Sequence, residues 1–187
     1  MELYEKTEHK IVQKTGNREV LDIDGHFFIR QINPGVIIMP YTVNEMGFPT
    51  KIGVISEILD QRPGGISMTL ITGSPEDDDK NIFQTAVREL REESGFEIKD
   101  LKRWKFLGSL YTSKMVMNSN PCFAVDITGS VAEEKETDGS QSEKDSKFEL
   151  INIDNALDLE DSLVSTLFIK TFKNLFNKNE QNTESTE

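Results

Sequence analysis

The chain has 187 residues, of which 36% are hydrophobic and 29% charged, and its formal net charge at pH 7 is −12. This length fits one domain with a sizeable core, and no apolar run reaches the roughly 20 residues of a membrane-spanning helix. The acidic balance provides no basic stripe, which disfavours extended nucleic acid as a partner. The sequence therefore predicts a protein with neither a membrane nor an extended nucleic-acid partner.

Cysteine content and the N-terminal residues indicate the compartment. Cys122 is the only cysteine and lies inside an apolar run, which is typical of a small core residue and excludes an internal disulfide. Residues 1–6 lack the cationic start and the apolar stretch of a secretory signal. We therefore expect a cytoplasmic protein.

Residues 1–32 are expected to form an N-terminal arm. Apolar residues alternate on both sides of Asp24 and Gly25, a dipeptide that favours a tight turn between two short strands. An earlier apolar pair, Ile11 and Val12, indicates a further strand or an irregular segment. The sequence thus predicts a β-hairpin arm that ends near residue 32.

Residues 33–176 are predicted to form the main domain. The apolar run at 36–39 is typical of a strand buried on both faces, at the centre of a sheet. Alternating or continuous apolar patterns predict further strands over 51–59, 66–71, 104–111, 121–127 and 148–153.

Two helices are predicted within this domain. Over 81–94, Ile82, Ala86 and Leu90 form one apolar stripe at helical spacing, and Gly95 is a natural C-terminal stop. A second apolar stripe predicts a closing helix over 163–176. Strands and helices together indicate an α/β (α+β) fold.

Two segments have the composition of exposed chain. Residues 131–147 are rich in Glu, Lys, Ser, Asp and Gly with no apolar residue after Ala132, which predicts a mobile acidic loop. The last residues, 177–187, carry no apolar side chain and are predicted to be a disordered tail.

Three carboxylates are predicted to share one side of the first helix. Glu89, Glu92 and Glu93 are three, four and one positions apart, so their negative charges repel one another unless a cation compensates them. Converging hard oxygen ligands of this kind suit Mg²⁺ or Mn²⁺. The alternative interpretation is a solvated acidic helix face, which is the common case for an isolated pair of glutamates.

The string Arg-Glu-Leu-Arg-Glu-Glu-Ser-Gly-Phe at 88–96 resembles the metal-binding half of the Nudix box. Similarity to the Nudix hydrolase family implies the Nudix fold, a mixed β-sheet sandwiched between helices. It also implies hydrolysis of a nucleoside diphosphate linked to another group, by metal-activated water.

The same resemblance implies roles for individual residues. Glu89 and Glu93 are expected to be the principal Mg²⁺ ligands, with Glu92 as a further ligand or a water-mediated contact and as a catalytic residue. Arg88 is expected to orient these carboxylates, and the backbone carbonyl near Gly73 to complete the metal coordination.

The first half of the box departs from the family pattern of Gly, five residues, Glu, seven residues and Arg. Counting back from Arg88 places Lys80 where the family has Glu, and Ser74 where it has Gly, with Gly73 one residue early. The family Glu supports the box arginine, so Lys80 removes that support unless Asp78 or Asp79 substitutes for it.

Residues 106–113 and 123–126 resemble the ADP-ribose pyrophosphatase branch of the family. That branch takes its catalytic base from a later acidic loop, where Glu143 is our first choice ahead of Glu133, Glu134 and Glu136. It commonly dimerises through an N-terminal arm, so we expect a homodimer.

Two arginines are candidates for contacting substrate phosphates. Arg30 and Arg62 carry guanidinium groups, which match the geometry of phosphate oxygens. The alternative for each is an ordinary surface cation.

The sequence supports three functional hypotheses. The first is a Mg²⁺-dependent pyrophosphatase acting on ADP-ribose or a related small nucleotide. The second is a Nudix-fold binding or structural module with weak or no catalysis, because the first half of the box is degenerate. The third is hydrolysis of another substrate: a nucleoside triphosphate, a dinucleoside polyphosphate, NADH or a capped RNA end, the last disfavoured by the acidic charge.

Overall fold

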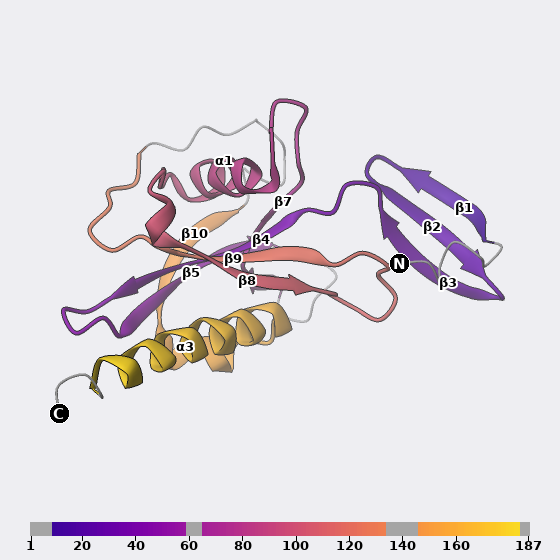
Figure 1. The fold of residues 1–187 in the computed structure, drawn as a ribbon. Helices are drawn as coiled ribbons and strands as arrows, with labels where there is room; N and C mark the ends of the chain where they lie inside the picture. The colour runs from indigo at the N-terminus through magenta and orange to yellow at the C-terminus, as the bar shows by residue number, and fades with distance from the viewer. Residues whose placement is uncertain (1–8, 59–64, 134–145, 184–187) are drawn as a thin grey trace.

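The computed structural model describes residues 9–58, 65–133 and 146–183. Arg62 and Glu143, and with Glu143 most of the predicted acidic loop, lie outside these ranges. The described chain forms two β-sheets and two α-helices (Figure 1).

The N-terminal arm is a three-stranded antiparallel sheet in the order β1-β2-β3. Its strands are β1 (Lys10–Thr15), β2 (Arg18–Ile23) and β3 (His26–Gln31). Asp24 and Gly25 join β2 to β3 with φ values of 52° and 79°, the two positive angles of a type I′ turn. The predicted hairpin is confirmed, and the pair Ile11 and Val12 belongs to a third strand.

The main sheet has seven strands, in the order β10-β5-β4-β9-β8, with β6 paired to β5 and β7 to β4. Only the β4–β9 pairing among these is parallel, which makes the sheet mixed. The bounds are β4 (Val36–Val43), β5 (Pro49–Ile58), β6 (Ile66–Thr69), β7 (Ile71–Gly73), β8 (Trp104–Leu110), β9 (Asn120–Asp126) and β10 (Lys147–Asn152).

Helices cover both faces of this sheet, α1 (Ile82–Ser94) on one and α3 (Ser162–Thr183) on the other (Figure 1). Two short 3₁₀ helices, η1 (Leu101–Arg103) and η2 (Ile153–Asp158), precede β8 and α3. The fold class predicted from the sequence is therefore confirmed. Helix α3 continues to Thr183, past the end predicted at residue 176. None of the helices in the described ranges is long and apolar enough to cross a membrane.

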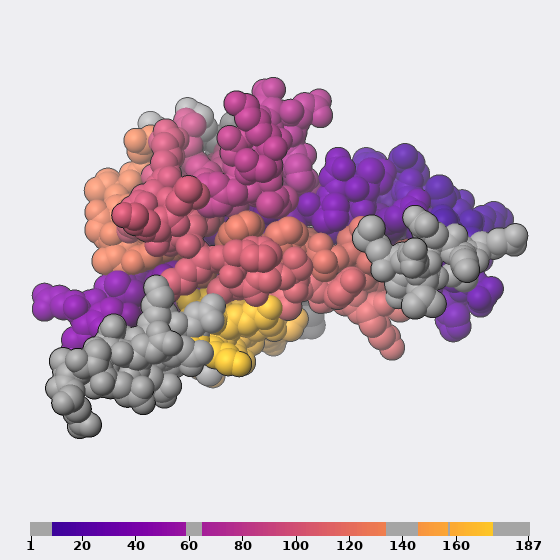
Figure 2. All heavy atoms as spheres, viewed as in Figure 1, coloured from indigo at the N-terminus to yellow at the C-terminus, as the bar shows by residue number. Residues whose placement is uncertain are grey.

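Strand β4 is buried on both faces because it lies between two apolar layers. Val36 and Ile38 belong to the core under α1, whereas Ile37 and Met39 belong to the core under α3. This alternation follows from the period of two in a strand and confirms that the run at 36–39 is central. The space-filling view shows the same order, with α1 above the strands and α3 below them (Figure 2).

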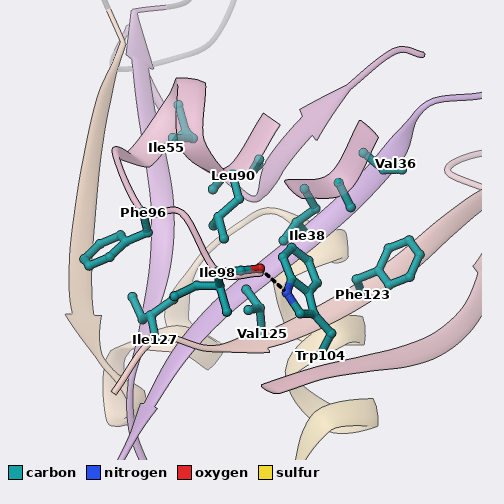
Figure 3. Packing of buried hydrophobic residues seen from close by; sticks show 12 residues of the cluster. Val36, Ile38, Ile55, Leu90, Phe96, Ile98, Trp104, Phe123, Val125 and Ile127 are labelled. Carbon is teal, nitrogen blue, oxygen red and sulfur yellow. Dashed lines mark hydrogen bonds between the residues drawn. The ribbon is translucent and has the colours of Figure 1, made fainter. Parts of the chain in front are cut away.

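Trp104 anchors the start of β8 in the core under α1. Its indole Nε1 donates a hydrogen bond to the Ile98 carbonyl over 2.8 Å (Figure 3). Its ring meets the ring of Phe83 edge-on at 5.1 Å between centroids, and that of Phe123 at 6.1 Å. Trp104 therefore ties β8 and the segment after α1 to the helix.

The two sheets are joined by backbone hydrogen bonds. Ile29 of β3 donates to the Met115 carbonyl over 2.8 Å and accepts from the Met117 N–H over 2.9 Å. The Gln31 N–H donates to Asn118 Oδ1 over 2.8 Å. The loop between β8 and β9 thus continues the edge of the N-terminal sheet.

We predict that Trp104→Phe lowers the free energy of unfolding by about 1–3 kcal/mol, because the buried Ile98 carbonyl loses its indole donor. The measurement is urea denaturation followed by circular dichroism. Tyr111→Phe is the matched control, since it removes a hydroxyl from an exposed ring and should change the value by less than about 0.5 kcal/mol. Equal effects of the two changes would contradict the assignment.

Candidate functional site

The candidate site lies where β7 leads into α1. Strand β7 pairs antiparallel with β4, with Gly73 opposite Val36. Residues 74–80 then lead to Asn81, whose Oδ1 accepts hydrogen bonds from the N–H groups of Phe83 and Gln84 and so caps α1. Gly95 ends the helix with a φ of 77°. The predicted helix boundaries are confirmed.

Arg88 is the centre of the site. Its Nη1 lies 2.9 Å from Glu89 Oε1 and 2.8 Å from Glu92 Oε2. Its Nη2 donates to the Ser74 carbonyl over 2.8 Å and to Asp79 Oδ2 over 3.0 Å. One guanidinium therefore ties the loop before the helix to two of the three box carboxylates.

Asp79 takes the supporting place that the family pattern gives to Glu. Its side chain is only 8% exposed, and its Oδ2 also accepts from the Glu76 N–H over 3.0 Å. Burial raises the pKa of Asp79, but hydrogen bonds from Arg88 and Glu76 outweigh burial and lower it overall. Lys80 is exposed, and its backbone N–H donates to Gln84 Oε1.

The spacing explains why a position-by-position comparison misplaces the loop. Five residues separate Gly73 from Asp79, as in the family pattern, but eight separate Asp79 from Arg88 instead of seven. The loop landmarks Gly73 and Asp79 have moved together by one position. Lys80 is therefore an additional residue before the helix, and the expected alternative of a substitute aspartate is confirmed for Asp79.

Glu89 lies directly against Gly73. A Cβ atom placed on Gly73 would meet the Glu89 Cδ at 1.8 Å, so any larger residue would displace this carboxylate. Glu89 is 8% exposed, and burial raises the pKa of its carboxyl to about 7, although Arg88 acts to lower it. A buried carboxylate of this kind is stabilised in its charged form by additional positive charge.

The donor chemistry fits a divalent cation. Glu89, Glu92 and Glu93 supply hard oxygen atoms from adjacent positions of α1, and the close approach of Gly73 keeps the space beside Glu89 free of a side chain. Within the described ranges no three His, Cys, Asp or Glu side chains converge as a ready metal site. The Arg88 guanidinium instead bridges Glu89 and Glu92.

Of the remaining site candidates, Arg30 is not brought to this cluster. Arg30 lies in β3, where its Nε donates to Glu19 Oε2 over 2.8 Å, so its guanidinium already binds a carboxylate. Its contact with a phosphate stays a prediction. Arg62 and Glu143 lie outside the described residues, and their roles also stay predictions.

A cleft on the outer side of α1 was missed by the sequence reasoning. It has a volume of ≈ 500 Å³ and is lined by residues of α1 and by alternate residues of 97–101. The available signal was the apolar pair Phe83 and Val87, four residues apart and off the stripe of Ile82, Ala86 and Leu90. Arg88 and Glu92 line this cleft as well.

Comparisons with known proteins agree with this geometry. The model of the NUDIX domain matches residues 50–169, and the chain therefore belongs to the Nudix family. No curated protein matches the sequence.

Solved structures of low sequence identity share the fold. The NUDIX domain of Shewanella oneidensis NrtR, complexed with ADP ribose, superposes with a TM-score of 0.53 at 11% identity, covering 76% of this chain and 88% of that one. A mutT/nudix family protein from Listeria innocua gives 0.55 at 17% identity, covering 80% of this chain and 97% of that one.

We predict that Asp79→Ala lowers the free energy of unfolding by about 1.5–3 kcal/mol, because the partly buried Arg88 loses a charged hydrogen-bond partner. Urea denaturation in metal-free buffer measures this change. Asp78→Ala is the matched control, since Asp78 is the exposed neighbouring aspartate, and Lys80→Ala should be equally mild. A larger effect from Asp78 or Lys80 than from Asp79 would contradict the assignment.

Proposed function

We propose that the protein is a Mg²⁺-dependent or Mn²⁺-dependent hydrolase that cleaves the pyrophosphate of ADP-ribose or a related nucleoside diphosphate derivative. The observation that carries this proposal is the buried Glu89 carboxylate against Gly73, held by Arg88 beside Glu92. ADP ribose bound to a Nudix domain of the same fold supports a small nucleotide as the substrate.

Each residue of the cluster has a role in this proposal. Glu89, Glu92 and Glu93 would hold the cation, with the backbone carbonyl near Gly73 completing its coordination. A divalent cation held there would supply positive charge to the phosphoryl oxygens and lower the pKa of a bound water. Arg88 contacts Glu89 and Glu92 and is itself bonded to the Ser74 carbonyl and Asp79, so it ties these two carboxylates to the loop before the helix.

Proton transfer needs an additional group. We propose Glu143 as the general base. It belongs to the segment that follows Glu133, the last described residue before 146. The Glu133 N–H donates to the Gly95 carbonyl over 2.8 Å, so this loop starts at the C-terminal end of α1.

The alternative is a binding module of the same fold with weak or no catalysis. It was motivated by Lys80 and Ser74, which depart from the family pattern. The ion pair between Asp79 and Arg88 weakens this alternative, because Asp79 supports Arg88 in place of the family glutamate.

We predict that the purified protein with Mg²⁺ or Mn²⁺ hydrolyses ADP-ribose to AMP and ribose 5-phosphate, and that Glu93→Gln lowers kcat at least 100-fold, on the order of the effect of losing one group that stabilises the transition state. Product formation is measured on a panel that includes a nucleoside triphosphate, a dinucleoside polyphosphate and NADH. Glu45→Gln, in the exposed turn before β5, is the control and should retain full activity.

The panel separates the hypotheses. Cleavage of another member with the same dependence on Glu93 would keep the mechanism and change the substrate. If no member is hydrolysed with either metal, the enzyme proposal is wrong and the binding module is favoured.

We also propose a homodimer formed through the N-terminal sheet, in a cytoplasmic protein. Phe27 and Ile29 lie on one face of β3 and are 55% and 39% exposed. Their cross-strand partners Asp22 and Val20 share that face. Exposed apolar side chains gathered on one sheet face are typical of a protein interface.

The dimer is tested by sedimentation of Phe27→Glu, which should shift the protein to a monomer because it replaces the exposed ring with a second carboxylate opposite Asp22. His26→Glu, on the opposite face of β3, is the control and should remain dimeric. A monomeric unsubstituted protein at micromolar concentration would contradict this proposal without affecting the proposed activity.

A further inference from the structure

Thr85 is a polar residue on the buried face of α1, near the start of the helix. It is 0% exposed, and it precedes Arg88 by three residues and Glu89 by four. Residues at these separations are neighbours on the surface of a helix. Thr85 therefore shares the side of α1 that carries the centre of the candidate site.

The hydroxyl of Thr85 has no hydrogen-bond partner among the residues that the structure describes. Two other buried helical hydroxyls, those of Ser94 and Thr171, each donate to the carbonyl four residues earlier, a common partner for a hydroxyl inside a helix. The corresponding carbonyl for Thr85 is that of Asn81, which already accepts from the N–H groups of Gln84 and Thr85. The Thr85 hydroxyl is therefore a buried donor that remains available, and leaving such a donor without a partner is unfavourable.

The Asp79 carboxylate is the acceptor that lies beside this hydroxyl, in the loop that connects β7 to α1 (Figure 1). Burial raises the pKa of Asp79, whereas Arg88, the Glu76 N–H and the Thr85 side chain lower it, and the net effect is a lowered pKa. A hydroxyl lowers the pKa of a carboxyl only at short range, because it acts as a donor to the charged form. Thr85 and Asp79 are therefore neighbours, although their present geometry falls short of a normal hydrogen bond.

The two oxygens of the Asp79 carboxylate are used unequally. Oδ2 accepts from Arg88 Nε over 3.3 Å, from Arg88 Nη2 over 3.0 Å and from the Glu76 N–H over 3.0 Å. The hydrogen bonds of Asp79 in the described part of the chain that have normal geometry all end on this oxygen, so Oδ1 is left as an acceptor. Arg88 thus does not engage both oxygens, as a forked arginine–carboxylate pair does. A carboxylate held through one oxygen can still turn about its Cβ–Cγ bond, where the torsional preference is broad.

We propose that Thr85 is a positioning residue, whose hydroxyl donates to Asp79 Oδ1 and so fixes the plane of this carboxylate against Arg88. Both side chains are shielded from water, which strengthens a hydrogen bond between them. A fixed Asp79 sets the direction of Arg88, whose Nη1 contacts Glu89 and Glu92. Thr85 acts on the site through Asp79 alone. Its consequence for catalysis rests on the proposed function, whereas its effect on Arg88 does not.

The test compares Thr85→Val, which keeps the branched shape and removes the hydroxyl, with Thr85→Ser, which keeps the hydroxyl. Thr85→Val should lower kcat for the hydrolysed panel member about tenfold, because hydrogen-bond partners behind metal ligands contribute about 10–100-fold to activity. Its KM should stay within about twofold, since no contact to the substrate is removed. Thr85→Ser should retain kcat within about twofold, because the donor is kept. Thr171→Val is the matched control, a buried helical threonine whose hydroxyl is bonded within α3, and should leave kcat unchanged.

A second measurement does not depend on turnover. The Nε–H of Arg88 donates to Asp79, and its exchange with water is followed by NMR, with Arg88→Lys identifying the signal. Thr85→Val should speed this exchange at least about fivefold, because a carboxylate that turns releases the Nε–H more often. Thr85→Ser and Thr171→Val should leave the exchange rate unchanged. In the Asp79→Ala background, Thr85→Val should have no further effect on exchange or kcat, since the group through which it acts is already absent.

The outcomes separate this inference from the proposed activity. Unchanged exchange at Arg88 in Thr85→Val would overturn the role of Thr85, and hydrolysis of a panel member by the unsubstituted protein would leave the activity standing. Faster exchange in Thr85→Val but not in Thr85→Ser, without hydrolysis of any panel member, would support the role and overturn the activity. An effect of Thr85→Ser as large as that of Thr85→Val would overturn the role, because serine keeps the hydroxyl.

Discussion

The structure of the candidate site depends on the position of one guanidinium group. Three glutamates on one side of α1 repel one another, and Arg88 offsets this by contacting Glu89 and Glu92 with the same nitrogen atom. Its second nitrogen holds the loop through the Ser74 carbonyl and Asp79. Removing one charged partner of the partly buried Arg88 costs about 1.5–3 kcal/mol, because a charged hydrogen bond is lost. Helix, loop and carboxylates are therefore held as one unit.

The elements best predicted from the sequence are those in which apolar side chains recur at the spacing of the buried face. The apolar run at 36–39 and the stripe of Ile82, Ala86 and Leu90 identified the central strand and the box helix, since the core imposes these patterns. The pairing of β4 with β9, and the break between β6 and β7 at Leu70, depend on contacts between distant segments, which a local pattern does not record. The end of α3 at Thr183 was missed because polar residues alone resemble a tail.

The site shows a different limit of sequence reasoning. Aligning the box by position places Lys80 where the family pattern has a glutamate. This alignment suggests that the loop has lost the carboxylate that supports Arg88. In space, Gly73 and Asp79 keep their mutual separation and reach Glu89 and Arg88, while the extra residue precedes the helix cap. The outer cleft was missed for a related reason: Phe83 and Lys99 come close only after the chain turns at Gly95 and runs back along the helix. Neither fact is visible from spacing within the helix.

The backbone hydrogen bonds between the two sheets determine how freely the sequence of the loop between β8 and β9 can change over evolution. Ile29 meets Met115 and Met117 through backbone atoms alone, so the joint places no demand on the identity of these side chains. These two bonds require only an N–H at Ile29 and at Met117, which every amino acid except proline provides. A third bond, from the Gln31 N–H to Asn118 Oδ1, does depend on a side chain. Apart from Asn118, the loop between β8 and β9 can therefore diversify in sequence while the N-terminal sheet stays attached to it. Families built on such a joint would vary in their loop residues and still keep the same shape.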